Sequence, residues 1–236
     1  MQPSRRLVLV LAVLLAPAAA APAAASFHLM QIEQVAGGFC GIRDAQAIQL
    51  RMRSVGQNLT TGTVLIARDA AGNNPVTLLT LPGNMANAAA GARILLATPG
   101  FSVAGGPTPD FTLANPIPAS YLEAGKLTFG FGATVYWSLA WGGANYTGTN
   151  TGAIDNDADG NFNPPYGDVL PFAGDLGLRF TGTAGAQSTN NAADYALSAS
   201  PATFTNNAGS SGAVGNCLFF DSFESGDVGG WSAVVP

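Results

Sequence analysis

Short apolar segments separated by glycine, proline and asparagine turns run along almost the whole chain. Residues 47–53 show the pattern most clearly, because Ile48, Leu50 and Met52 alternate there with polar side chains. A period of two is typical of a half-buried β-strand with a polar outer face. No segment combines the length and the 3.6-residue period of an amphipathic helix. The sequence therefore predicts an all-β fold, an antiparallel β-sandwich.

Turn signals about every 8–12 residues divide the chain into short strands, as in a β-sandwich. The predicted strands cover residues 27–35, 47–53, 63–68, 76–81, 93–97, 126–131, 134–139, 176–180, 193–197 and 217–220, with a weaker one at 110–113. Ser120 is expected to cap a single helical turn. Residues 142–171 predict a long acidic loop rich in Gly and Asn, and residues 206–215 a flexible polar linker.

The first 25 residues have the features of a secretory signal peptide. The pair Arg5-Arg6 precedes the apolar run Leu7–Leu15, and an A-x-A cleavage sequence ends at Ala25. The pair also fits twin-arginine export, which the very apolar residues after it disfavour. The run is shorter than the ~20 residues that span a bilayer, so no membrane insertion of the mature form is expected. We expect a protein that begins near Ser26 and is secreted, periplasmic or at the cell surface.

The expected mature chain is acidic. Removal of Arg5 and Arg6 leaves 7 basic residues against 14 acidic ones, a net charge of −7. Such a charge repels the phosphates of nucleic acids and anionic lipid headgroups. Neither nucleic acid nor a membrane surface is therefore an expected partner.

Two cysteines, Cys40 and Cys217, lie near opposite ends of the expected mature chain. In an oxidising compartment such a pair favours a disulfide that joins the two ends of the domain. The alternative is a separate buried thiol in each terminal strand, because sequence does not give the Cα separation that a disulfide needs. With His28 as the single histidine, these cysteines do not suggest a metal site.

Several short motifs resemble the lamin-tail family. They are I-x-x-V at 32–35, D-A-Q-A-I-Q-L at 44–50, T-V-L-I at 63–66, L-G-L-R-F at 176–180, N-N-A-A-D-Y at 190–195 and S-P at 200–201. The resemblance covers residues 30–207, with an insertion, although Gln46 and Gln49 stand where the family prefers acidic residues. It implies an immunoglobulin-like β-sandwich used as a binding or accessory module in secreted bacterial proteins.

The resemblance also divides the chain. Residues 1–25 are expected to be the signal peptide, residues 26–207 the sandwich with its insertions, and residues 208–236 a linker with a terminal motif. That motif, F-E-S-G-D-x-x-x-W-S at 223–232, resembles elements at the ends of other secreted bacterial proteins. The whole chain also resembles uncharacterised secreted bacterial proteins, which imply no activity.

The acidic loop contains the sharpest chemical signal. Carboxylates at alternating positions precede Gly160, which is the opening half of a calcium loop. The expected ligands are Asp155, Asp157, Asp159, Asn161 and Asp168. Tyr166 occupies the twelfth position, where such loops place a glutamate. A solvated loop with Asx turns is the alternative, and a bound calcium ion would stiffen the loop without performing chemistry.

An aromatic run precedes the acidic loop. Trp141 and Tyr146 are candidate ligand-binding residues, because aromatic faces beside Asn and Asp can stack on a sugar ring. Burial in the sandwich core is the alternative, and it is favoured for Trp137.

The sequence does not suggest a catalytic site. His28 has no serine nucleophile in a characteristic turn to act on, and the loop aspartates do not form the separated acid and nucleophile of a glycoside hydrolase. We therefore expect a secreted, non-catalytic binding or surface-associated module, with a polysaccharide or a surface protein as its ligand. A calcium-stabilised structural or matrix protein is the second hypothesis, and a carbohydrate-active enzyme is the third.

Overall fold

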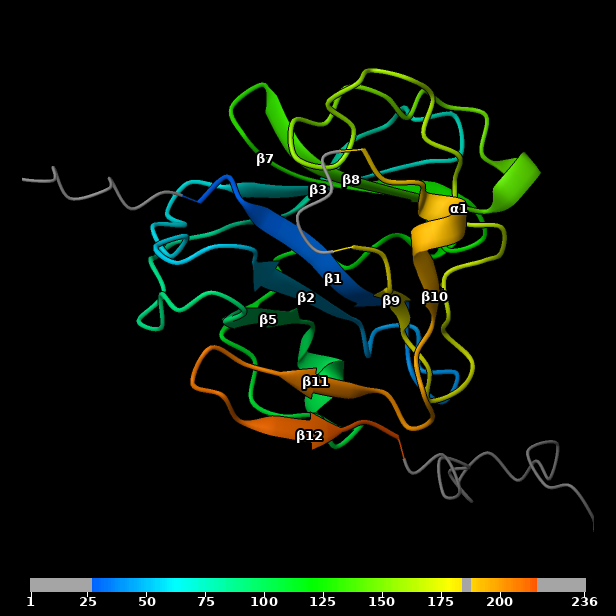
Figure 1. Ribbon diagram of the computed structural model, residues 1–236. Helices are drawn as coiled ribbons and strands as arrows, with labels where there is room; N and C mark the ends of the chain where they lie inside the picture. Colours follow the sequence, from blue (N-terminus) through cyan, green and yellow to red (C-terminus); the bar gives the residue numbers. More distant parts are fainter. Residues whose placement is uncertain (1–26, 184–187, 216–236) are drawn as a thin grey trace, which may run out of the picture.

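The computed structural model describes residues 27–183 and 188–215, and these form two facing β-sheets and a separate hairpin (Figure 1). The six-stranded sheet has the order β10 (Tyr195–Leu197), β9 (Leu178–Phe180), β1 (Met30–Ala36), β2 (Ala47–Met52), β5 (Arg93–Ala97), β6 (Phe111–Thr112). The four-stranded sheet has the order β4 (Val76–Thr80), β3 (Val64–Arg68), β7 (Gly125–Phe131), β8 (Thr134–Trp141). The hairpin is β11 (Thr203–Thr205) with β12 (Ser211–Ala213). All pairings are antiparallel except that of β5 with β6.

Within residues 27–183 and 188–215, helical structure is confined to short segments. The helix α1 spans Asn191–Asp194, and 3-10 turns span Pro99–Ser102, Ala119–Tyr121 and Gly143–Asn145. The expected all-β fold with antiparallel sheets is thus confirmed. Within the part of the chain that the structure describes, no helix is long and apolar enough to cross a bilayer.

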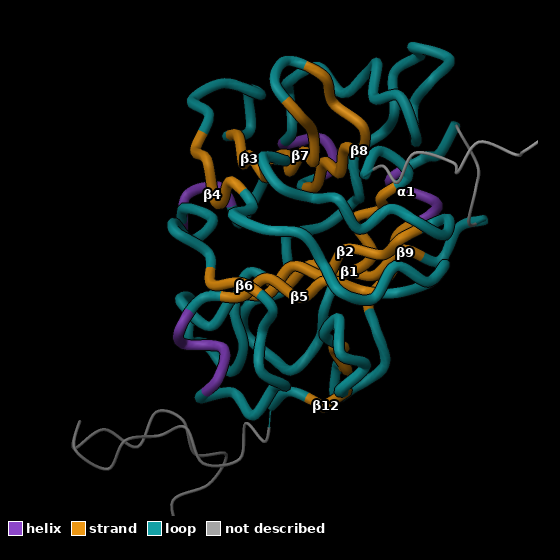
Figure 2. Tube along the Cα trace, turned by 90° about the vertical axis from the view of Figure 1, so that its left-hand side faces the viewer, coloured by secondary structure: helices purple, strands orange, loops and turns teal. Residues whose placement is uncertain are grey.

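The sheets and the hairpin form three layers (Figure 2). The larger core lies between the two sheets, where Leu50 of β2 belongs to the same buried cluster as Phe129 and Trp137. Two polar side chains of this core are hydrogen-bonded to each other. The indole Nε1 of Trp137 donates to the hydroxyl of Tyr195 at 2.9 Å, and this hydroxyl donates to the carbonyl of Ile32 at 2.6 Å. These bonds remove the cost of burying both polar groups.

A second core fills the other side of the six-stranded sheet. Phe204 of β11 packs against Phe39 and Phe101, with ring centroids 5.8 and 5.5 Å away. The three rings belong to a buried apolar cluster that is separate from the larger core. The hairpin therefore covers the face of the sheet that the alternating sequence of β2 assigns to solvent.

Two expectations are wrong for the same reason. The polar face of β2 is not solvated at Gln49, which is only 2% exposed. Its Oε1 accepts a hydrogen bond of 2.6 Å from the Thr205 amide of β11. Residues 206–215 are not a flexible linker, because β12 pairs with β11 in register from Thr203↔Ala213 to Thr205↔Ser211. Asn206 closes the turn by accepting the Ser210 amide at 3.0 Å.

Most other predicted strands are confirmed, with boundaries that shift by a few residues. β1 begins at Met30 instead of Phe27, and β8 extends to Trp141. The helical turn near Ser120 exists, but it follows Pro118 and has no side-chain cap. Residues 142–171 form a long loop with one short 3-10 turn, as expected. The signal peptide, the strand at 217–220 and the terminal motif lie outside the described residues.

Candidate functional site

The acidic loop is attached to the free edge of β8 by asparagine side chains. The Ser138 amide donates to Asn156 Oδ1 at 3.0 Å, and Asn156 Nδ2 donates back to the Ser138 carbonyl at 2.8 Å. Two residues further along β8, the Ala140 amide donates at 3.0 Å to Oδ1 of Asn191, which belongs to α1 and in turn accepts Asn150 Nδ2 of the loop. An uncovered edge strand exposes unpaired backbone groups that invite aggregation. The asparagines satisfy these groups, so the loop is a structural part of the sheet.

Asp155 lies at the start of β8, close to the first described residues. Its amide donates to the Tyr136 carbonyl at 2.8 Å, and its carbonyl accepts Arg53 Nη1 at 2.8 Å. Its carboxylate Oδ2 lies 3.8 Å from His28 Nδ1. Burial raises the pKa of Asp155, while the charges of Arg53 and His28 oppose that rise. The carboxylate of Asp155 therefore already faces two basic side chains.

Asp157 is the most unusual acid of the loop. It is 2% exposed, and within the part of the chain that the structure describes its Oδ2 has no hydrogen-bond partner. Burial raises its pKa to about 6, and neighbouring Asp159 adds to the rise. Asp159 itself is exposed, and the Ser188 hydroxyl donates to its Oδ2 at 2.7 Å. A buried carboxylate beside a second carboxylate is an arrangement that a cation stabilises.

The remaining expected calcium ligands do not join this pair. The Asn161 amide donates to Asp159 Oδ1 at 3.1 Å, so Asn161 contacts the carboxylate through a donor. The backbone carbonyl of Asp168 accepts the Gly142 amide, whereas the backbone amide of Asp155 donates to the Tyr136 carbonyl at the other end of β8. Six residues of strand separate these two points, which is ~20 Å. Among the described residues, no three His, Cys, Asp or Glu side chains come together as a metal site.

Behind the loop lies a buried amide cluster that the sequence analysis missed. Asn150 Nδ2 donates to the Asn163 carbonyl at 2.9 Å and to Asn191 Oδ1 at 2.8 Å. The Asn191 amide donates to Asn163 Oδ1 at 2.7 Å. These three asparagines are at most 2% exposed. Single asparagines in a polar segment are typical of turns, so only their three-dimensional convergence distinguishes this cluster.

The two aromatic residues expected to bind a ligand are buried. Trp141 is fully buried, and its Nε1 donates to the Tyr121 carbonyl at 2.8 Å. Tyr146 is 5% exposed, and its hydroxyl donates to the Thr149 carbonyl at 3.0 Å. Neither ring presents a face to a ligand in this structure. Trp137 lies in the core, which is the alternative that the sequence favours.

Other aromatic residues line an open groove. The groove has a volume of about 320 Å³, and Tyr166, Asp168, Phe172, Leu176 and Leu197 contribute to its lining. The exposed Arg43 lies over the Phe172 ring, with its guanidinium carbon 5.1 Å from the ring centroid. Burial and the charge of Asp168 raise the pKa of Tyr166. The sequence gives little indication of this groove, because Tyr166 and Phe172 are isolated aromatic residues among Gly, Pro and Asp.

The loop that forms this groove is anchored at several points. The Tyr166 amide donates to the Ala140 carbonyl at 2.8 Å, and the Leu170 amide donates to the Leu122 carbonyl at 2.9 Å. The Pro171 carbonyl accepts the Gly37 amide at 2.8 Å. These bonds attach the loop to β8 and to the end of β1. A groove held in this way loses little conformational entropy when a ligand binds.

Of the two cysteines, Cys40 lies within the described residues. It packs against the smaller apolar cluster, which also contains Val214. Cys217 lies outside the described residues, so the disulfide stays a prediction.

Comparison of the chain with protein-family models, with curated proteins and with solved structures found no match. A function is therefore inferred from the geometry of this chain, chiefly from the groove beside β9 and β10 and from the pair of Asp157 and Asp159.

Proposed function

We propose that this protein is an exported, non-catalytic binding module that holds a sugar unit of a polysaccharide in the groove beside β10. The observation that carries the proposal is the combination of two aromatic rings, Tyr166 and Phe172, with the Asp168 carboxylate in a groove of about 320 Å³. Ligand sites begin at about this size and are mostly apolar, with a few polar groups that fix orientation. An aromatic face packs on the apolar face of a sugar ring, and an ionised carboxylate accepts its hydroxyl groups.

The position of Asp168 fits this role. Its Oδ1 accepts the amide of Val169 at 2.8 Å, which holds the carboxylate at the rim of the groove. The side chain is exposed, so it can accept a hydroxyl without first losing a buried partner. A preorganised acceptor of this kind adds orientation to the apolar contact.

Isothermal titration with a panel of neutral oligosaccharides tests the proposal. Phe172→Ala should weaken the binding of a positive oligosaccharide by about tenfold, because it removes one stacking surface. The matched control is Phe162→Ala, which removes a ring that is 58% exposed and does not line the groove. Equal binding by the wild type and Phe172→Ala, or no binding from any member of the panel, would contradict the proposal. Appearance of new reducing ends in the same samples would contradict its non-catalytic part.

A calcium-stabilised structural role is the second candidate. It is favoured by the buried, unpartnered Oδ2 of Asp157 beside Asp159. We restrict the proposed ion to this pair of the five expected ligands, because the Asp168 carboxylate accepts the Val169 amide and the Asp155 carboxylate faces His28.

We further infer that the two sheets form an immunoglobulin-like sandwich of the lamin-tail type. In support, the motif segments 32–35, 47–50 and 178–180 lie in the neighbouring strands β1, β2 and β9, and 64–66 lies in β3 of the facing sheet. An experimental structure with a different arrangement of these four strands would contradict the inference. Export is part of the proposal, and N-terminal sequencing of the secreted protein should find a start near Ser26.

A further inference from the structure

The outer face of the six-stranded sheet, turned away from the four-stranded sheet, carries a row of long polar side chains. Gln31 of β1 pairs with Arg51 of β2, and Arg51 pairs with Arg93 of β5. Directly opposed residues in antiparallel strands have Cβ atoms about 5 Å apart, and like charges in such positions repel each other. The row therefore brings two arginine side chains onto neighbouring strands of one face, with the Gln31 amide on the next strand.

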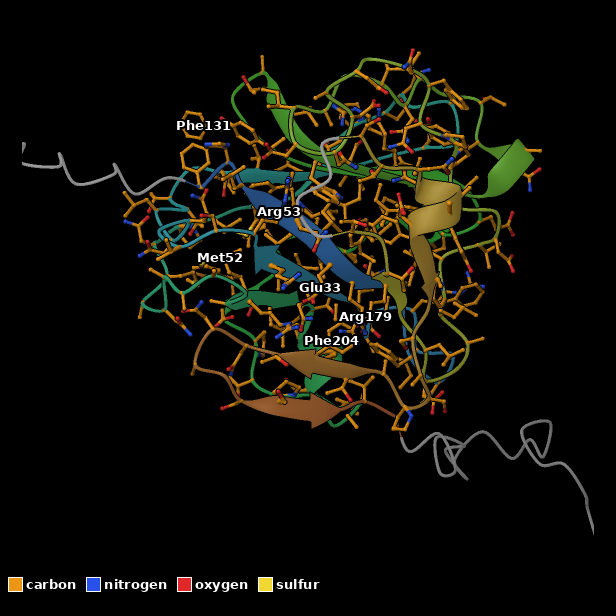
Figure 3. The ribbon with its side chains drawn as sticks, in the orientation of Figure 1. Glu33, Met52, Arg53, Phe131, Arg179 and Phe204 are labelled. Atoms are coloured by element: carbon orange, nitrogen blue, oxygen red, sulfur yellow. The ribbon has the colours of Figure 1, made fainter. Side chains whose placement is uncertain are left out.

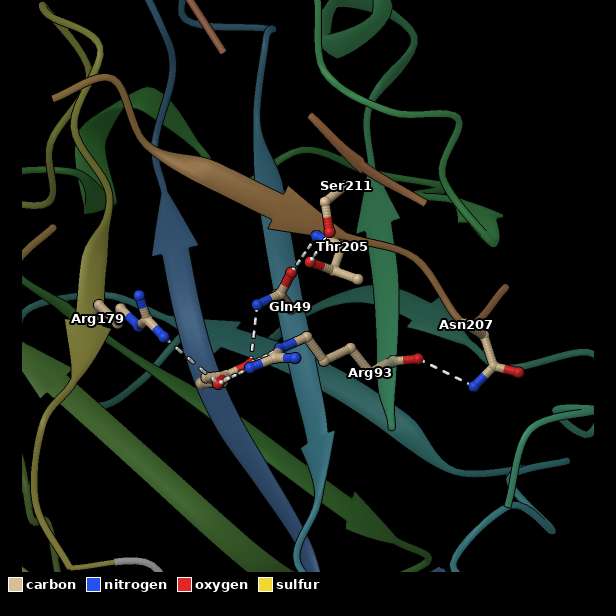
Figure 4. Close-up of polar contacts among 7 residues, drawn as sticks. Gln49, Arg93, Arg179, Thr205, Asn207 and Ser211 are labelled. Carbon is tan, nitrogen blue, oxygen red and sulfur yellow. Dashed lines mark hydrogen bonds and ion pairs between the residues drawn. The ribbon is translucent and has the colours of Figure 1, made fainter. Parts of the chain in front are cut away.

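Among the described residues, Glu33 is the carboxylate that forms ion pairs with Arg93 and Arg179 of this face, and Figure 4 labels these two arginines. Its Oε2 accepts Arg93 Nε at 2.7 Å, and its Oε1 accepts Arg93 Nη2 at 3.0 Å. Gln49 Nε2 donates to the same carboxylate at 2.8 Å, and Arg179 Nη2 lies 4.0 Å from it. In Figure 3 Glu33 and Arg179 likewise lie close together on this face. One carboxylate thus faces two arginines and is already saturated by Arg93 and Gln49.

Arg51 is left outside this network. Among the described residues, no carboxylate lies within ion-pair distance of its guanidinium group. Its Nε is buried and has no hydrogen-bond partner. Together, Arg51, Arg93 and Arg179 bring three positive charges against the one negative charge of Glu33. This face is therefore locally basic, although the mature chain as a whole is acidic.

The floor of the row contains unused hydrogen-bond donors. Gln31 is 1% exposed, and neither its Nε2 nor its Oε1 has a hydrogen-bond partner among residues 27–183 and 188–215. Gln34 is equally buried, and its Nε2 also lacks a partner among these residues. Buried polar groups are normally hydrogen-bonded, because an unpaired one keeps its full desolvation cost. With Arg51 Nε, four buried polar atoms of this face lack a partner among the described residues, and three of them are N–H donors. Such a set suits a ligand that accepts hydrogen bonds.

We propose that Gln31, Arg51 and Arg93 form a binding site for an oxyanion, the carboxylate or phosphate group of a ligand. A guanidinium group matches both groups with a bidentate pair of N–H donors, and the Gln31 amide adds a donor from below. The arginine side chains give access from solvent, since that of Arg93 is 30% exposed. This site is separate from the groove beside β10 and does not depend on the sugar proposal.

Isothermal titration at low ionic strength tests the site with inorganic phosphate in one arm and D-glucuronate in the other. Binding of phosphate alone identifies a phosphate group as the ligand, and binding of glucuronate alone identifies the carboxylate of an acidic sugar. Arg51→Gln should weaken either interaction by at least about tenfold, because it removes the charged donor pair. Arg43→Gln makes the same charge change over Phe172 and should leave the affinity within about twofold.

Gln31→Met separates a binding role from a structural one. If the amide is kept for a ligand, this variant should melt at a higher temperature without ligand, because a desolvated amide is replaced by an apolar side chain of similar size. It should also bind the anion more weakly. A lower melting temperature with unchanged binding would assign Gln31 a structural role and overturn the proposal. Absence of heat from both probes at millimolar concentration, or equal affinity of wild type and Arg51→Gln, would overturn it as well.

Discussion

At neutral pH, the buried carboxylate of Asp157 lowers the stability of the folded protein. Its carboxylate is enclosed behind β8, where burial and Asp159 raise its pKa to about 6, and Lys126 and the Gly152 amide only partly offset this. An aspartate in the unfolded chain has a pKa of 3.8. The folded state therefore binds a proton more tightly than the unfolded state, and the stabilisation that protonated Asp157 provides at acid pH is lost as the pH rises from about 4 to 6.

Asp157→Asn should accordingly stabilise the metal-free protein at pH 7. We expect a gain on the order of 1 kcal/mol after solvent screening, or ~2–4 °C in Tm. The difference between variant and wild type should disappear near pH 4. Thermal unfolding followed by circular dichroism at both pH values measures it, with the exposed Asp44→Asn as the control. A variant that is less stable than the wild type at pH 7 would show that the charged carboxylate has a partner in solution.

At the scale of elements, the hairpin β11–β12 converts a two-layer arrangement into three layers. Phe204 is fully buried and makes edge-on contacts with two other rings. Phe204→Ala should lower the free energy of unfolding by ~3–5 kcal/mol, because it leaves a cavity in the second core. Phe162→Ala, at an exposed position, should change it by less than ~0.5 kcal/mol. Urea titration measures both, and equal stability of the two variants would mean that the hairpin is not packed on the sheet.

The acidic loop is the second element with a testable role. If Asp157 and Asp159 hold calcium, millimolar calcium should raise the Tm at pH 7, because a ligand of the folded state alone stabilises it by mass action. The rise should shrink below pH 6, as protonated Asp157 no longer attracts a cation. Asp157→Ala should remove most of the rise, and Asp221→Ala, in the C-terminal tail outside the described residues, should retain it. A Tm that does not respond to calcium in the wild type would leave the loop with its structural role alone.

The local sequence pattern predicts where the strands lie better than it predicts which of their side chains other segments cover. The alternation at residues 47–53 correctly assigns Leu50 to the core, because a period of two is set by the strand itself. The same alternation assigns Gln49 to solvent, and the prediction fails because Phe204 and Thr205 arrive from far along the chain to cover it. In the sequence, Asn156 and Asn191 look like ordinary turn residues, because their partners on β8 are also distant along the chain. Their function at the β8 edge depends on partners that no local pattern specifies.

At the scale of the whole molecule, the segment around Cys40 and the last described residues meet at the smaller apolar cluster. Cys40 packs on this cluster, and Val214 is part of it. The Val214 amide donates to the Ala202 carbonyl at 2.8 Å, which fixes this point of the chain. Cys217 follows three residues later, and three extended residues span ~10 Å. The predicted disulfide between Cys40 and Cys217 is therefore compatible with the fold, and it would close a loop that contains nearly the whole domain.

Such a loop gives a disulfide a large effect, because cross-linking distant residues removes much of the entropy of the unfolded chain. The chain-entropy model allows about 4–5 kcal/mol, so reduction should lower the Tm by on the order of 10 °C. The exported protein should show no titratable thiol under denaturing conditions, and two after reduction. A Cys40→Ser, Cys217→Ser double variant should melt like the reduced wild type and ignore reductant, which separates the cross-link from side effects of the reagent. Two titratable thiols in freshly exported protein would contradict the pairing and leave the apolar clusters to hold the ends of the domain together.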